Sequence, residues 1–293
     1  MGFESNKILN IKNKNKNKGN NTILFISEIR WLSMSEVPME YKVLKKKFSM
    51  SLQKSLKDDL KAILVFGGVA ANKVYSGVSD IDFMIIIDHI KNLKSFSETI
   101  NKLGQEILSM VENPLFASLL DYEIYTLDQL PDANGMNGFS AIKALALKES
   151  EVLFGENYFD SLNIDKENLK SSALLMVHEY LSKLIAYNLS PKFDPLFEEE
   201  DENMYADDLS EEIFLAVDAV LLSAQAYHMI KNNKYISMPD VVLFGETEKI
   251  EGVDNSLIVD IGYLRQGVEN KVENVVKRSI DFCGQIIDTL SKL

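Results

Sequence analysis

The sequence predicts a mixed α/β or α+β domain followed by an all-helical domain. Three apolar runs are typical of buried strands: 62–66, 83–87 and 119–127. Apolar residues spaced by three or four predict helices among these strands, at 41–60, 93–111 and 139–150. Because strands and helices alternate closely, we expect a small mixed sheet here. After about residue 160 the spacing is helical alone, which predicts a bundle.

Three segments follow from this pattern. Residues 1–35 contain the Lys/Asn run 12-KNKNKNKGNN-21, which has nothing to bury and predicts a disordered or poorly ordered tail. Residues 36–160 form the mixed domain and residues 161–293 the helical domain. Within the latter, apolar periodicity predicts helices at 169–185 and 213–227 and a long terminal helix at 258–290, interrupted near Gly267.

Composition narrows the class of protein. The chain has 293 residues, 46% of them hydrophobic and 26% charged, as in a soluble globular protein. Its net charge of −13 argues against nucleic acid as a partner, since phosphate binding needs a basic surface. The single cysteine, Cys283, excludes an intrachain disulfide and a cysteine-based zinc cluster. No apolar run approaches the roughly 20 residues that span a bilayer, so we expect a cytoplasmic protein without a membrane segment.

The most informative stretch is 66-FGGVAANKVYSGVSDIDFMIII-87. Alternate residues of a strand face one side, so Asp80 and Asp82 project together and repel each other unless a cation lies between them. Oxygen ligands favour Mg²⁺, which commonly combines a few carboxylates with phosphate oxygens. Upstream, Gly67 and Gly68 end a strand and can open a helix at 69–73, whose first amides would face a phosphate. These features predict a metal and triphosphate site.

This stretch resembles the signature of the polymerase β-like nucleotidyltransferase superfamily: a hydrophobic residue, Gly, Gly or Ser, a gap of this length and Asp-x-Asp. Within that superfamily it is most similar to the prokaryotic minimal nucleotidyltransferases and the kanamycin nucleotidyltransferase type. The resemblance covers about 41–160 and extends to 153-LFGE-156, similar to the segment that closes such a domain. Residues 161–293 resemble the helical domain that often follows only in their pattern.

The resemblance implies roles for individual residues. Asp80 and Asp82 would hold Mg²⁺, and Ser79 fits the SDID motif beside the phosphate-binding Gly67 and Gly68. A third carboxylate on a neighbouring strand would bind metal or take the acceptor's proton.

For that third carboxylate, the run 123-EIYTLDQL-130 makes Glu123 the first choice and Asp121 the reserve. Asn72 and Lys73 lie where they could contact the β and γ phosphates. For Lys73, however, a solvated side chain is the favoured role.

The expected activity is magnesium-dependent transfer of a nucleoside monophosphate, with AMP from ATP favoured, to a hydroxyl group of a small molecule or protein. The alternative is a non-catalytic module that senses nucleotide or binds a protein as an antitoxin does. A homodimer is left open.

Overall fold

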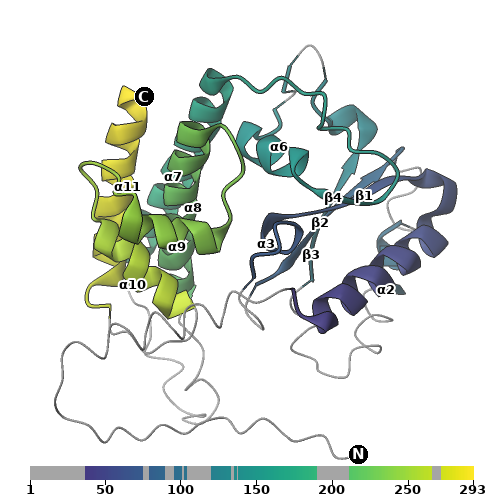
Figure 1. Cartoon of the computed structure of the whole chain (residues 1–293), viewed down its shortest axis with the longest axis horizontal. Coiled ribbons are helices and arrows are strands. Elements are labelled where there is room, and N and C mark those ends of the chain that lie inside the picture. Colours follow the sequence, from purple (N-terminus) through teal and green to yellow (C-terminus); the bar gives the residue numbers. More distant parts are fainter. Residues whose placement is uncertain are drawn as a thin grey trace, which may run out of the picture.

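The computed structural model describes residues 37–74, 79–89, 96–100, 102–103, 120–132, 135–136, 138–189, 211–265 and 272–293. The tail predicted at 1–35 lies outside these residues, as does most of the helix predicted at 93–111. The fold class agrees with the prediction: a small mixed sheet with flanking helices precedes a helical bundle (Figure 1).

The sheet has the order β3-β2-β1-β4 among the described strands. Its members are β1 (Leu60–Phe66), β2 (Ile81–Ile87), β3 (Leu120–Thr126) and β4 (Glu151–Phe154). β1 runs antiparallel to both β2 and β4, whereas β2 and β3 are parallel. The parallel register pairs Asp82 with Asp121 and Met84 with Glu123. The two acids of β3 therefore lie beside the strand that carries the Asp-x-Asp motif.

One face of the sheet is covered by α2 (Met39–Leu56), which lies across it in Figure 1. The buried residues of α2 recur at spacings of three and four, which places Tyr41, Leu44 and Phe48 on one side of the helix. They pack on alternate residues of the central strands. The Phe48 and Phe83 rings, for example, meet edge to face with centroids 4.6 Å apart.

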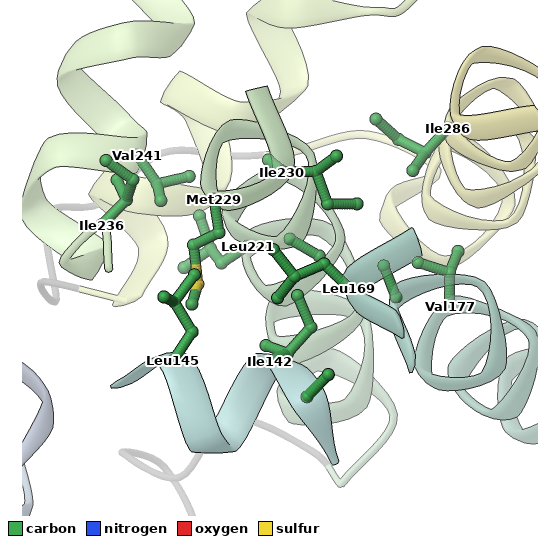
Figure 2. Packing of buried hydrophobic residues seen from close by; sticks show 14 of the residues in the cluster. Ile142, Leu145, Leu169, Val177, Leu221, Met229, Ile230, Ile236, Val241 and Ile286 are labelled. Carbon is green, nitrogen blue, oxygen red and sulfur yellow. The ribbon is translucent and has the colours of Figure 1, made fainter. Parts of the chain in front are cut away.

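The other face of the sheet packs against α6 (Ala141–Lys148) and, through it, against the bundle. Figure 2 shows Ile142 and Leu145 of α6 directed toward Leu221 and Met229 of the bundle. The same buried cluster contains β-strand residues such as Leu64 and core residues of every bundle helix. The hydrophobic core is therefore continuous from the sheet into the bundle. The boundary near residue 160 stays a prediction.

The bundle contains α7 (Lys166–Leu189), α8 (Glu211–Asn232), α9 (Met238–Thr247), α10 (Asn255–Arg265) and α11 (Val275–Lys292). α7, α8 and α11 pack against one another, and α9 and α10 pack against α8 (Figure 1). Two differences from the sequence prediction stand out. α9 was not predicted, and the long terminal helix is divided into α10 and α11.

α8 also qualifies one sequence-based expectation. Residues 213–232 are long and apolar enough to cross a membrane by length and composition, although no such run was expected. In the folded chain, however, 67% of this window is buried against the rest of the protein. Such burial is that of a core helix of the bundle, and Val217, Val220 and Leu221 supply much of it.

Candidate active site

A pocket of about 450 Å³ opens between one end of the sheet and the bundle. The α/β part supplies the Gly67–Gly68 turn, the Asp80 and Asp82 pair, and residues of β3 and α6. The bundle supplies residues of α7, α8, α9 and α10. The pocket is lined by more acids than bases: Asp80, Asp82, Asp121, Glu123 and Asp218 against Lys73, Lys143 and Arg265. This acidic excess favours a ligand that brings a cation with it.

The Gly67–Gly68 turn is shaped by close approaches that only glycine permits. Gly67 has a φ of 74°, and a Cβ atom there would lie 2.2 Å from Oδ2 of Asp82. At Gly68 a Cβ atom would lie 2.8 Å from the backbone oxygen of Lys73, whose N–H donates to the Gly68 oxygen at 2.9 Å. The two glycines thus bring the Asp82 carboxylate and the Lys73 backbone against the turn.

The helix after this turn is shorter than expected. The sequence predicted a helix at 69–73, but α3 begins at Gly67 and ends at Ala70. Asn72 adopts a left-handed conformation with a φ of 55°, which cannot continue a right-handed helix. A single helical turn therefore follows the glycine pair, which lines the pocket, and Asn72 and Lys73 form the loop that leaves it.

Asp80, Asp82 and Asp121 form one electrostatic group. Burial, followed by the charges of Asp80 and Asp121, raises the pKa of Asp82 to about 7. Burial also raises the pKa of Asp80, which Arg265 partly offsets and Asp121 reinforces. Among the described residues, no Lys or Arg is ion-paired with Asp80 or Asp82 within 4 Å. Asp82 is half-buried and Asp80 is exposed, and two neighbouring like charges are destabilising unless a cation compensates them.

These carboxylates suit Mg²⁺ by the chemistry of their oxygen donors and by the repulsion that a divalent cation would relieve. The described part of the chain contains no group of three or more His, Cys, Asp or Glu side chains arranged to hold a metal ion. The fit therefore rests on Asp80 and Asp82, with further oxygens to come from a phosphate ligand, as is common for Mg²⁺.

Glu123 is held by two neighbours. Nζ of Lys143, on α6, lies 2.5 and 2.6 Å from the two carboxylate oxygens of Glu123. The hydroxyl of Tyr125 donates to Oε2 at 2.9 Å. Burial and this bond to Glu123 raise the pKa of Tyr125 to about 12, so its hydroxyl stays protonated. Lys143 was not singled out in the sequence, because nothing in the local pattern of α6 distinguishes it from an ordinary helical lysine.

The bundle wall carries polar groups that no sequence motif indicated. On α8, Asp218 lies 3.7 Å from Nη1 of Arg265 on α10, and burial raises the pKa of its carboxyl. Tyr180 of α7 has a pKa raised to about 12 by burial and by Asp218. Burial raises the pKa of Tyr235, and the negative charges of Asp82 and Asp240 raise it further, while a hydrogen bond with Gln225 lowers it.

Lys73 lines the pocket and pairs with a residue of the bundle. The sequence favoured a solvated lysine at this position, but its Nζ lies 2.7 Å from both carboxylate oxygens of Asp240 on α9. The Lys73 side chain remains 42% exposed, while that of Asp240 is 17% exposed. Ser79, by contrast, contributes its backbone to the fold: its oxygen accepts a bond from the Tyr41 hydroxyl at 2.9 Å.

A solved structure is similar to this chain in its overall fold. It is the crystal structure of spectinomycin adenyltransferase from Enterococcus faecialis with ATP and spectinomycin, and the two match with a TM-score of 0.54 over 85% of this chain and 99% of that chain. This chain shares the fold of that adenyltransferase.

The resemblance seen in the sequence is thus confirmed at the level of the fold. Identity between the two chains is 14%, so the roles of individual residues stay predictions. No protein-family model and no curated protein sequence matches the chain.

Proposed function

We propose that this protein is a magnesium-dependent nucleotidyltransferase that moves AMP from ATP to a hydroxyl group of a small acceptor. The observation that carries the proposal is the convergence of Asp80, Asp82 and the Gly67–Gly68 turn on one pocket. The pocket occurs in a fold shared with an adenyltransferase solved with ATP. A protein that uses ATP in this way would work in the cytoplasm.

Asp80 and Asp82 would hold the metal, which when bound supplies charge neutralisation around the triphosphate. The Gly67–Gly68 turn would receive the phosphates through backbone N–H groups. Glycine is needed at Gly67 because a bulkier residue would displace Asp82. In the transfer, an acceptor oxygen forms a bond to the α-phosphorus and the bond to the β-phosphate oxygen breaks. Pyrophosphate leaves, and the acceptor's proton passes to a carboxylate.

The two acids of β3 divide the remaining work in this proposal. Asp121 raises the pKa of both Asp80 and Asp82, which supports a place for it beside the metal pair. Glu123 lies two residues further along β3 and is oriented by Lys143 and Tyr125. A carboxylate oxygen has lone pairs beyond those that these two donors use, so Glu123 can still accept the acceptor's proton. We therefore keep Glu123 as the general base.

A small acceptor is favoured over a protein side chain. The bundle supplies part of the pocket wall, including Tyr180 and Asp218. The structural neighbour was solved with a small acceptor, spectinomycin, beside ATP. A non-catalytic nucleotide sensor is the competing function, and it is favoured by the close contacts that Lys143 and Tyr125 make with the proposed base.

The decisive experiment supplies ATP labelled at the α-phosphate, Mg²⁺ and fractionated cell extract, together with a panel of hydroxylated small molecules. We expect label on a small molecule, with one pyrophosphate released per label transferred. Asp80→Asn and Asp82→Asn should abolish transfer, whereas Asp160→Asn, at an exposed acid outside the pocket, should not. Magnesium-dependent binding of ATP without transfer to any fraction would support the sensor. Absence of magnesium-dependent binding would contradict both functions.

A further inference from the structure

The Lys73–Asp240 ion pair joins the loop after the glycine turn to α9 of the bundle. Both Asp240 oxygens lie 2.7 Å from Lys73 Nζ, which is the geometry of a charge-assisted pair. The backbone N–H of Lys73 donates a hydrogen bond to the Gly68 oxygen, so the lysine lies beside the turn proposed to receive phosphates. Both partners come from segments whose neighbours line the same pocket, namely Gly68 on one side and Pro239 on the other.

Asp240 is fixed from its own side as well. Ser237 is the N-cap of α9: its hydroxyl accepts from the Asp240 N–H at 3.4 Å and donates to Asp240 Oδ2 at 2.7 Å. The carboxylate therefore has a defined position in the first turn of a helix, where a negative charge is stabilised by the helix dipole. An acid held this way does not simply move aside when a second anion approaches Lys73.

We propose that Asp240 is a specificity-determining residue of the nucleotide pocket, because its carboxylate competes with the triphosphate tail for the Lys73 ammonium. This inference rests on the proposed function, since it takes the pocket to bind a nucleoside triphosphate. Asp240 would lower affinity for ligands that carry β and γ phosphates and leave affinity for a monophosphate unchanged. The pocket would thereby bind triphosphate more weakly than its three cations alone allow.

Two opposing effects decide whether Asp240 weakens or strengthens triphosphate binding. The Asp240 carboxylate and a phosphate bound about 5 Å away would repel each other. At an effective dielectric of about 20, this repulsion is equivalent to roughly a hundredfold in affinity. Holding a lysine in place saves side-chain entropy worth at most about thirtyfold. Repulsion therefore outweighs pre-organisation. Because a bound metal screens part of the phosphate charge, we expect a net penalty of about tenfold, or 1.4 kcal/mol.

The test is an equilibrium titration of the full-length protein, in Mg²⁺, with a non-hydrolysable ATP analogue and separately with AMP. The variants are Asp240→Asn, Lys73→Met and the double variant. The matched control is Glu248→Gln, which removes an acid at the other end of α9 whose carboxylate pairs with Lys231 at 3.8 Å, outside the pocket. A thermal unfolding curve for each variant verifies that it is folded.

We expect Asp240→Asn to bind the ATP analogue about tenfold more tightly and AMP as the parent protein does. Lys73→Met alone should bind the analogue more weakly, because it removes the cation that both anions share. Adding Asp240→Asn to it should relieve the repulsion that remains, and Glu248→Gln should resemble the parent. Weaker or unchanged binding of the analogue by a folded Asp240→Asn protein overturns the inference alone, as does an equal change for AMP. If the parent binds neither ligand, the proposed function falls and this inference with it.

Discussion

Replacing Asp82 with Asn should stabilise the metal-free protein. Asp82 is half-buried, and desolvation together with the charges of Asp80 and Asp121 raises its pKa from 3.8 to about 7. At pH 8 it is nevertheless ionised in the folded state. This rise in pKa means that the ionised carboxylate destabilises the folded protein by at most about 4 kcal/mol. Asn matches the shape of Asp without the charge, but its amide must find acceptors in a partly buried site. We therefore expect a net gain of about 2 kcal/mol.

The measurement is urea unfolding at pH 8 with a chelator present, comparing the parent with Asp82→Asn and with the exposed Asp160→Asn as control. Added Mg²⁺ should then raise the stability of the parent and leave Asp82→Asn unchanged, a readout that does not depend on catalysis. A metal-free Asp82→Asn protein that is less stable than the parent by more than about 1 kcal/mol, with a neutral control, would refute the repulsion argument. The Asp82 charge would then be structural.

Three further predictions concern the base, the turn and the bundle core. Glu123→Gln should reduce turnover by roughly 100-fold with ATP affinity nearly unchanged, and Asp121→Asn should reduce it less, measured by steady-state kinetics; the reverse order would assign the base to Asp121. Gly67→Ala, whose methyl group would lie 2.2 Å from Asp82, should remove magnesium-dependent ATP binding in a titration and cost about 1–2 kcal/mol in stability; unchanged binding would contradict the proposed role of the turn. Burial lowers the pKa of His228 to about 4, below the roughly 6.5 of an unfolded chain, so its contribution to stability is intact above pH 6.5 and is lost as the pH falls toward 4. The loss should approach about 3 kcal/mol and be absent in His228→Phe, and unfolding curves that depend on pH alike in both proteins would contradict it.

His228 is buried in an apolar part of the bundle. Neither ring nitrogen has a hydrogen-bond partner among the described residues, and the ring packs against Phe244 with centroids 4.9 Å apart. Protonation would place an unpaired charge in that core.

Local sequence predicted β1, β2, β3 and the Asp80–Asp82 motif because these depend on short-range patterns, but it did not predict β4. It could not predict α9. The pentapeptide VLFGE occurs at 152–156, where it forms most of β4 and a turn at Gly155, and again at 242–246, where it lies inside α9. Five identical residues thus take two structures, and packing against α8 and α10 decides the second.

The far side of the candidate site was hidden for a related reason. Asp240 and Lys73 are 167 positions apart, and Glu123 and Lys143 are 20 apart on different elements. Arg265 ends a helix that the sequence joined to the next one. No short-range spacing encodes such meetings, since they exist only once the sheet and the bundle pack together.

The continuous core between sheet and bundle bears on how acceptor choice can change. Ile142 and Leu145 of α6 are buried against α8. The helices that line the pocket therefore also form the hydrophobic interface, or seam, between the sheet part and the bundle. Transplanting a foreign bundle would expose that seam or fill it badly. New acceptors are better reached by single replacements on the lining side, at positions such as Tyr180, Asp218 and Leu222, which border the cavity.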